Sequence, residues 1–256
     1  MTIRYNRMQK ILGYIRRACQ EFDLIENGDR IAVGVSGGKD SLVLLAGLAK
    51  MRRFYEKKYD ITAITLDPRF GGVETDYSPV ERLCAELGVD FRLIRTDIGE
   101  IVFDIRKEPN PCSLCAKMRR GALHDEAKAA GCNKIALGHN NDDAIETFIM
   151  NLFQEGRIGC FAPISYLSRK DITLIRPLVF APEHAVMSCA KRNGFEIVKS
   201  KCPADKTTTR QTTKEFLAAL EHENKGVKQR IFGAMRKGNI DRWGYKESSD
   251  DKADNP

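Results

Sequence analysis

Short apolar runs alternate with longer stretches of helical periodicity along the middle of the chain. The runs of strand length lie at residues 30–35, 60–67, 91–95, 134–138 and 172–175, with a shorter one near 196–199. Stretches with apolar residues at helical spacing separate them, at residues 41–57, 78–87, 117–130, 142–153 and 182–193. Because these strands lack polar alternation and are separated by helices, the pattern predicts an α/β fold with a doubly wound, mainly parallel sheet.

Helical segments are also predicted outside this core. Residues 3–22 place apolar side chains at helical spacing and leave a basic outer face, and two further helices are predicted at 209–222 and 227–237. The final residues are polar and acidic, and we expect them to be disordered. The predicted organisation is an N-terminal basic helix (1–28), a central α/β domain (29–200), a C-terminal helical region (201–246) and an acidic tail (247–256).

The charge balance indicates a polyanionic partner. The chain has 42 Lys and Arg residues against 35 Asp and Glu residues, a formal net charge of +7, and its acidic tail hides part of the excess on the remaining residues. No apolar run approaches the roughly 20 residues that a membrane span needs, and residues 1–10 contain no apolar signal core. We therefore expect a cytoplasmic protein without membrane contact, in which closely spaced cysteines serve metal binding or catalysis rather than disulfides.

A glycine-rich segment, Val35-Ser-Gly-Gly-Lys-Asp-Ser41, joins the first predicted strand to the first predicted helix of the core. Ligands of open α/β sheets bind beyond the carboxyl ends of the strands. Glycines allow a phosphate to approach closely, the helix start presents unpaired N–H groups, and the lysine and serines add donors. A Walker A loop is excluded because Asp40 follows Lys39. The alternative interpretation is a glycine turn capped by serine.

This segment resembles the signature Ser-Gly-Gly-x-Asp-Ser of the PP-loop ATP pyrophosphatases. The resemblance implies an adenine-nucleotide-hydrolase-like fold in which the loop grips the pyrophosphate end of ATP while AMP is transferred to an oxygen of the substrate. The nucleotide-binding residues that it implies in this loop are Val35, Ser36, Gly37, Gly38, Lys39, Asp40 and Ser41.

A second polar segment, at residues 138–147, follows another predicted strand and is expected at the same edge of the sheet. Carboxylates and phosphate oxygens hold Mg²⁺, the ion that accompanies ATP, and Asp40 with Asp143 can supply the carboxylates from two adjacent loops. Asp142 suits a helix cap. The sequence therefore predicts a magnesium site between the two loops.

The family resemblance extends around this second segment. A Gly-His-x-x-Asp-Asp sequence lines the nucleotide site of PP-loop proteins, which implies binding roles for Gly138 and His139; a structural histidine is the alternative. Arg176, in Leu174-Ile-Arg-Pro-Leu178, is expected to reach a phosphate or RNA, with a surface ion pair as the alternative.

Three cysteines are set apart by their surroundings. Cys112 and Cys115 have metal-ligand spacing just before a predicted helix, and the basic residues that follow stabilise thiolates. Cys202 stands in a polar, basic loop. Three thiolates can hold three irons of a 4Fe-4S cluster and leave the fourth iron open. Cys160 is unassigned. The cysteines interpreted as core residues are Cys19, Cys84, Cys132 and Cys189.

The order of these segments, from about Arg30 to Lys237, resembles the tRNA 2-thiocytidine synthase (TtcA-type) family. The resemblance implies an ATP-dependent tRNA sulfurtransferase that adenylates the C2 oxygen of an anticodon-loop cytidine at position 32 and replaces it with sulfur, using ATP, Mg²⁺ and a 4Fe-4S cluster. The catalytic residues implied are Asp40, Arg119 and Asp143. The ligands implied are Asp40 and Asp143 for Mg²⁺, and Cys112, Cys115 and Cys202 for the cluster.

The partner that this family implies is tRNA. Basic residues within 4–17 and 225–242 are expected to contact its phosphates, with a solvated charged face as the alternative. Phe70, Phe161 and Tyr166 are candidates for stacking on a loop base. A sulfur donor such as a cysteine desulfurase, and a second copy of the chain in a homodimer, are further partner expectations.

The sequence leaves other functions open. A 2-thiouridine-forming or lysidine-forming enzyme would share the phosphate loop and the acidic segment, although a lysidine-forming ligase has no need for the three cysteines. A thiolase that uses a cysteine persulfide without a cluster is another alternative. A rival from a different class is a non-catalytic, nucleotide-binding iron–sulfur redox sensor.

Overall fold

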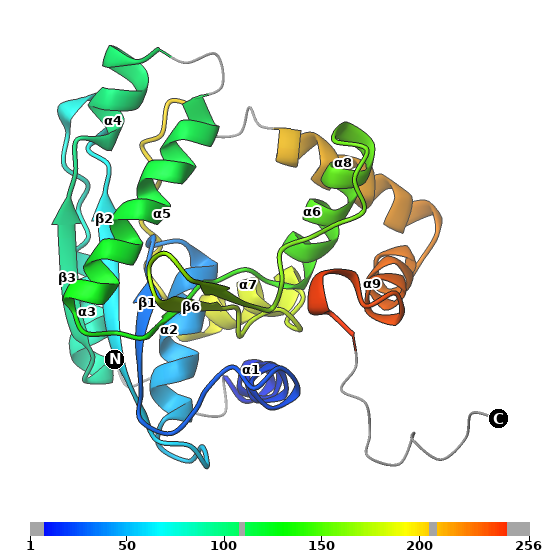
Figure 1. Cartoon of the computed structure of the whole chain (residues 1–256), viewed down its shortest axis with the longest axis horizontal. Coiled ribbons are helices and arrows are strands. Elements are labelled where there is room, and N and C mark those ends of the chain that lie inside the picture. The colour runs from blue at the N-terminus through cyan, green and yellow to red at the C-terminus, as the bar shows by residue number, and fades with distance from the viewer. Residues whose placement is uncertain (1–7, 108–110, 205–208, 245–256) are drawn as a thin grey trace.

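The described strands form one sheet. A computed structural model describes residues 8–107, 111–204 and 209–244 of the 256-residue chain. The order of the strands across the sheet is β3-β2-β1-β4-β6-β5, and all neighbours are parallel except β5 and β6. The predicted α/β fold with a mainly parallel sheet is confirmed (Figure 1). The strands are β1 (Asp29–Gly34), β2 (Tyr59–Asp67), β3 (Asp90–Arg95), β4 (Lys134–Ala136), β5 (Ile164–Leu167) and β6 (Ile172–Ile175).

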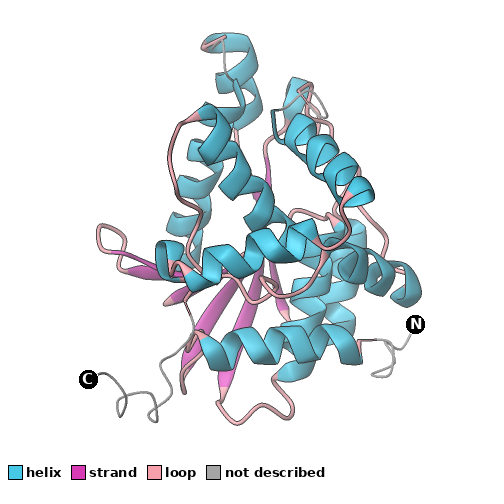
Figure 2. Ribbon diagram, turned by 90° about the vertical axis from the view of Figure 1, so that its right-hand side faces the viewer, coloured by secondary structure: helices cyan, strands magenta, loops and turns pink. Residues whose placement is uncertain are grey.

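Helices pack around this sheet, as Figure 2 shows. None of the described helices is long and apolar enough to cross a membrane. The longer helices are α1 (Gln9–Glu21), α2 (Lys39–Met51), α3 (Ser78–Leu87), α5 (Pro111–Ala129), α6 (Asn141–Gln154), α7 (Glu183–Asn193), α8 (Thr209–Glu223) and α9 (Val227–Lys237). The shorter helical segments are η2 (Phe70–Gly72), α4 (Ile98–Glu100), η3 (Ile101–Ile105) and η4 (Ile240–Arg242).

Different helices cover the two faces of the sheet. Val33 of β1 belongs to the larger core, which includes residues of α1, α2, α3 and α7. Ala32 of β1 and Ile64 of β2 belong to a second core with Ala127 of α5. Because successive strand residues point to opposite faces, both faces of β1 are buried. This double burial accounts for the unbroken apolar pattern of the strand.

The two ends of the described chain pack together. Trp243 is fully buried with its ring centroid 6.1 Å from that of Phe22, and its Nε1 donates to the Phe161 carbonyl oxygen at 2.7 Å. Arg236 of α9 is buried and forms an ion pair with Glu21 of α1. The C-terminal helices therefore close over the N-terminal helix.

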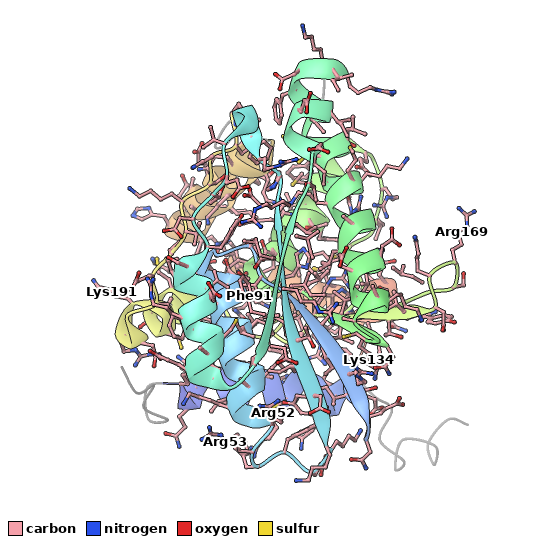
Figure 3. The ribbon with its side chains drawn as sticks, turned by 90° about the vertical axis from the view of Figure 1, so that its left-hand side faces the viewer. Arg52, Arg53, Phe91, Lys134, Arg169 and Lys191 are labelled. Carbon is pink, nitrogen blue, oxygen red and sulfur yellow. The ribbon has the colours of Figure 1, made fainter. Side chains whose placement is uncertain are left out.

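Some basic residues expected to face RNA lie inside the fold. Arg236 is only 3% exposed, and the Nζ of Lys228 lies 2.9 Å from Oδ1 of Asp142 in an ion pair with α6. The expectation that residues 225–242 present their charges to phosphates is wrong for Arg236, which is buried against Glu21, whereas Lys228 is half-buried. Arg169, by contrast, projects outward from the loop between β5 and β6 (Figure 3).

The structure lacks one predicted strand and contains one that was not predicted. Residues 196–199 form no strand, because the backbone of Val198 bonds to the phosphate loop instead of the sheet. A strand that the sequence pattern did not predict, β5, pairs antiparallel with β6. It was missed because it is four residues long and lies at the sheet edge, where Tyr166 is exposed.

Two predicted helices have different ends. The helix predicted to run to residue 57 ends at Met51, where a turn brings Tyr55 against Tyr59 with the ring centroids 6.4 Å apart. The helix predicted from residue 117 begins at Pro111, a residue that suits the first turn of a helix. The cysteine pair thus lies within the helix rather than before it. The start of the predicted N-terminal helix and the acidic tail at 247–256 lie outside the described residues.

Candidate active site

The phosphate loop and the acidic loop meet beyond the carboxyl ends of two neighbouring strands. The phosphate loop follows β1 and the acidic loop follows β4, its parallel neighbour. Gly138 lies so close to the other loop that a Cβ there would be 3.1 Å from the Asp40 carbonyl carbon and from the Ser41 nitrogen. Asn140 Nδ2 donates to Oδ1 of Asp40 at 3.0 Å. The two predicted segments form one site.

Serine side chains hold the phosphate loop in shape. The hydroxyl of Ser41 donates to the Gly38 carbonyl oxygen at 2.9 Å and lies 3.2 Å from the Ser36 hydroxyl. Gly37 has a φ of +80°, in the left-handed region that favours glycine. Helix α2 has no side-chain cap at its N-terminus. Its first N–H groups are therefore suited to bind an anion.

Lys39 is held between two carboxylates. Its Nζ lies 2.9 Å from Oδ2 of Asp40 and 3.1 Å from Oε1 of Glu183, at the start of α7. Burial alone would lower the pKa of Lys39, but Asp40 and Glu183 raise it above its usual value. Lys214 of α8 also pairs with Glu183, at 2.7 Å. The loop lysine is therefore a fixed cation, positioned by its neighbour Asp40 and by Glu183, which is far from it in the sequence.

Asp143 divides its two oxygens between two partners. Its Oδ2 accepts from the Asn140 amide at 2.9 Å, and Asn140 Oδ1 accepts from the Asp143 amide at 3.1 Å, so these residues form a capping box at the start of α6. Its Oδ1 lies 3.1 Å from Nη1 of Arg210 on α8. Burial raises the pKa of Asp143, while Asn140 and Arg210 oppose that rise and Asp40 adds to it.

Asp142 points away from this site although it is adjacent in sequence. Its Oδ2 accepts from the Glu183 amide at 2.7 Å, and its Oδ1 pairs with Lys228. The interpretation of Asp142 as a cap of its own helix is wrong, because Asn140 caps α6 and Asp142 binds the start of α7 instead. The two neighbouring aspartates thus have different surroundings, as the sequence indicated, although Asp142 binds the start of α7 rather than its own helix.

The donor set between the loops fits a divalent cation. Asn140 binds Asp40 through its side chain and Asp143 through its amide, so one residue orients both carboxylates. The negative charge of Asp40 helps to raise the pKa of Asp143. A divalent cation would relieve this repulsion, because carboxylate oxygens are the ligands that Mg²⁺ prefers.

A buried carboxyl lies behind Asp143 on the same helix. Glu146 is only 4% exposed, and burial, with the nearby charge of Asp143, raises its pKa to about 7. Arg210 reaches the next residue as well, since its Nη2 donates to the Thr147 hydroxyl at 3.2 Å. Glu146, Arg210 and Lys214 were not among the predicted site residues. Their role depends on α8 folding back over α6.

His139 and Arg176 are buried beside the acidic loop. The Nδ1 of His139 has no hydrogen-bond partner among the described residues, and burial lowers the pKa of this histidine to about 3, so its ring is neutral. Arg176 is 7% exposed, donates to the Ala162 carbonyl oxygen at 2.6 Å and lies 4.9 Å from the centre of the Phe161 ring. The alternative of a surface ion pair for Arg176 is therefore wrong.

The three aromatic candidates for base stacking differ in their surroundings. Phe161 is packed against His139, with ring centroids 4.9 Å apart. Phe70 packs edge-on against Phe103 at 5.6 Å. Tyr166 is 61% exposed and donates to Oδ1 of Asp171 at 3.0 Å. Of the three, Tyr166 has the most accessible ring.

The cysteines separate into two groups. The four predicted core cysteines, at 19, 84, 132 and 189, are all buried, which confirms that interpretation. Cys160 donates to the Ala144 carbonyl oxygen at 3.3 Å, and burial raises its pKa to about 12. Its thiol is therefore protonated and serves packing.

The other three thiols share one neighbourhood. Cys112 and Cys115 lie in the first turns of α5, three residues apart and thus on neighbouring turns of one helix. Burial raises the pKa of Cys115, Arg119 opposes that rise, and the nearby Cys202 and Cys112 add to it. In residues 8–107, 111–204 and 210–244, no three His, Cys, Asp or Glu side chains are assembled as a metal site. Cysteine thiolates beside a cation are nevertheless the donors that an iron–sulfur cluster takes.

Comparisons with known proteins agree with this geometry. A family model described as a PP-loop domain matches residues 8–220. A tRNA-cytidine(32) 2-sulfurtransferase of Geobacter sulfurreducens is 38% identical over 242 residues, which cover 93% of this chain and 91% of that protein. A protein of the same name from Syntrophotalea carbinolica is 36% identical and covers 92% of this chain and 90% of its own. The solved structure of the U34-tRNA thiolase NcsA from Methanococcus maripaludis, with its 4Fe-4S cluster, has a TM-score of 0.73 and 25% identity, covering 90% of this chain and 79% of that one.

We expect Glu146 to make folding stability depend on pH. Its folded pKa of about 7 lies above the ordinary 4.5, so the folded state binds the proton more tightly than the unfolded chain. Protonation of Glu146 therefore contributes to the free energy of unfolding. This contribution is fully present below the unfolded pKa and is lost as the pH rises through the folded pKa. Glu146→Gln should therefore raise the free energy of unfolding by up to about 3 kcal/mol at about pH 8, and much less at about pH 5.

Urea denaturation at the two pH values measures this difference. Glu223→Gln, at an exposed position of α8, is the matched control and should change stability little at either pH. A Glu146→Gln effect of equal size at both pH values would contradict the raised pKa.

Proposed function

The chain belongs to the PP-loop family and, within it, to the tRNA 2-thiocytidine synthases, and from this membership we propose that it is an ATP-dependent tRNA sulfurtransferase acting on cytidine 32. The observation that carries the proposal is the contact of Gly138 with the Asp40–Ser41 backbone, which gathers phosphate donors and carboxylates at one sheet edge. The relatives at 38% and 36% identity are named for cytidine 32, whereas the thiolase at 25% is named for U34, which favours cytidine. The relatives do not favour a lysidine-forming ligase or a redox sensor.

The phosphate loop is suited to the adenylation step. The amides at the start of α2 and the hydroxyl of Ser36 offer donors to the pyrophosphate end of ATP, and Lys39 adds a fixed cation. The C2 oxygen of the cytidine then bonds to the α-phosphorus. The bond between that phosphorus and the oxygen bridging to the β-phosphate breaks, and PPi leaves with the electron pair. Stabilisation of this leaving charge by fixed cations is the main catalytic contribution that we assign to the loop.

Asp40 and Asp143 would hold the Mg²⁺ that accompanies ATP. Both carboxylates are oriented by Asn140, and their charges are balanced by Lys39 and Arg210. When bound, the ion neutralises phosphate charge. The protein's own contribution is to hold the two carboxylates on adjacent loops, so that their spacing is set before the nucleotide arrives.

Cys112, Cys115 and Cys202 would hold the 4Fe-4S cluster, which supplies the sulfur that replaces the activated oxygen. In that replacement the bond between C2 and its oxygen breaks, and the oxygen leaves as part of AMP. Arg119 opposes the effect of burial on the pKa of Cys115, which favours the thiolate. We also assign Arg119 to offset the negative charge of the departing AMP.

The partners and surroundings of the enzyme follow from its substrate. The tRNA is the polyanion that the basic composition indicated, and we assign sulfur supply to a donor such as a cysteine desulfurase, in the cytoplasm.

Leu152, Phe153 and Phe216 are exposed, and the rings of Phe153 and Phe216 lie 5.8 Å apart on α6 and α8. An exposed apolar pair of this kind is suited to the contact of a homodimer.

PPi release separates the two neighbouring aspartates. With ATP, Mg²⁺ and tRNA that lacks thiolation, the natural chain should release PPi, and Asp143→Asn should slow that release by about 100-fold because a carboxylate at the phosphates is lost. Asp142→Asn, which keeps the bond to the Glu183 amide, should stay within about threefold of the natural chain because it lies outside the site. Equal rates for the natural chain and Asp143→Asn would contradict the proposed site.

Cluster ligation is tested by replacing single cysteines. After anaerobic purification, Cys112→Ser, Cys115→Ser and Cys202→Ser should each lose iron, acid-labile sulfide and formation of 2-thiocytidine. Cys160→Ser should keep all three, because a serine hydroxyl can replace the thiol as donor to Ala144. Unchanged iron and sulfide in Cys202→Ser would show that this cysteine is not a ligand.

A further inference from the structure

The segment that leads to Cys202 lies directly on the phosphate loop. The amide of Val198 donates to the Gly37 carbonyl oxygen at 3.0 Å. A Cβ on Gly37 would lie 2.6 Å from the Cβ of Val198, so only glycine lets the two approach this closely. Val198 also packs against the main hydrophobic core. The backbone four residues before Cys202 is therefore attached to the loop proposed to bind phosphates.

The chain beyond Cys202 is attached to the acidic loop. Arg210, eight residues later, binds Oδ1 of Asp143 at 3.1 Å and the Thr147 hydroxyl at 3.2 Å. One turn further along α8, Lys214 binds Glu183, the carboxylate that also holds Lys39. The start of α8 therefore contacts the acidic loop directly and the phosphate loop through Glu183.

Cys202 lies between these two attachments in the sequence. In Figure 1 the gold segment before α8 runs alongside the start of α5. The Nζ of Lys201 adds a bond to the Glu74 carbonyl oxygen at 2.8 Å. The described parts of this stretch, on either side of residues 205–208, thus contact the phosphate loop and the acidic loop.

We propose that Val198 and Arg210 are positioning residues through which a nucleotide on the phosphate loop fixes Cys202 beside Cys112 and Cys115. The proposal rests on the proposed binding of ATP at this loop. Arg210 holds one oxygen of Asp143, and phosphates bound at the neighbouring loop offer its guanidinium a second anionic partner, so a bound nucleotide strengthens the attachment of α8 to the site. Nucleotide binding therefore acts on Arg210, while Val198 responds to the backbone of Gly37. Such differential contacts shift the population toward one arrangement of the segment.

The position of Cys202 is measured by its rate of alkylation in the full-length, reduced, cluster-free protein. The chain is treated with iodoacetamide with and without Mg²⁺ and α,β-methylene-ATP, an analogue that cannot release PPi, and the modified Cys202 peptide is quantified by mass spectrometry. The nucleotide should slow alkylation of Cys202 in the natural chain by about fivefold or more, the lower end of typical coupling between two sites.

Variants separate positioning from a general loss of structure. Arg210→Gln should abolish most of the nucleotide-dependent slowing, Arg210→Lys should restore part of it, and Val198→Ala, which keeps the amide, should reduce it. Arg157→Gln, at an exposed arginine paired with Glu155, is the matched control and should behave as the natural chain. If Arg210→Gln fails to bind the analogue at saturating concentration, the comparison is made with Val198→Ala instead.

Binding of the analogue is measured in the same samples by calorimetry. It separates a failure of the proposed nucleotide site from a failure of the positioning role. No binding to the natural chain would overturn the proposed nucleotide site itself. Binding without any change in Cys202 alkylation, or full slowing retained in both Arg210→Gln and Val198→Ala, would overturn the positioning role and leave the proposed function standing.

Discussion

The parallel pairing of β1 with β4 is the constraint on which the site depends. The register pairs Ile31 with Lys134 and Val33 with Ala136, so the two strands end side by side. Each loop is short, and the glycine at 138 allows the second loop to touch the first. Because β1 also pairs with β2 on its other side, these loops lie at a point where the strand order changes direction, the usual place of a ligand in an open α/β sheet.

A network of paired charges holds the side chains of this site in place. Lys39, Asp40 and Glu183 form one chain of contacts, and Asp143 with Arg210 forms another. Partly buried charges are costly to leave unpaired, so each carboxylate has a cation even without a nucleotide. Much of the pairing comes from α7 and α8, which explains why a helical extension beyond the sheet belongs to the site. The loop between these two helices carries Cys202.

Local patterns explain how far the sequence could be interpreted. The strand-to-helix junctions predicted both loops, because the residues involved are adjacent in the chain. The ion pair between Asp143 and Arg210 joins residues 67 positions apart, and it depends on the docking of α8, which no local pattern reports. The segment around Val198 has the composition of a strand, yet it bonds to Gly37 instead of the sheet. Burial likewise excluded a surface ion pair for Arg176 and a reactive thiol for Cys160, which the sequence left open.

We have proposed that these loops and thiols together thiolate a cytidine of tRNA. Nucleoside mass spectrometry of total tRNA from cells that lack the protein tests it most directly. We expect 2-thiocytidine to be absent from these cells and to return when the natural chain is expressed again. Unchanged 2-thiocytidine, with no other thionucleoside lost, would contradict the claim.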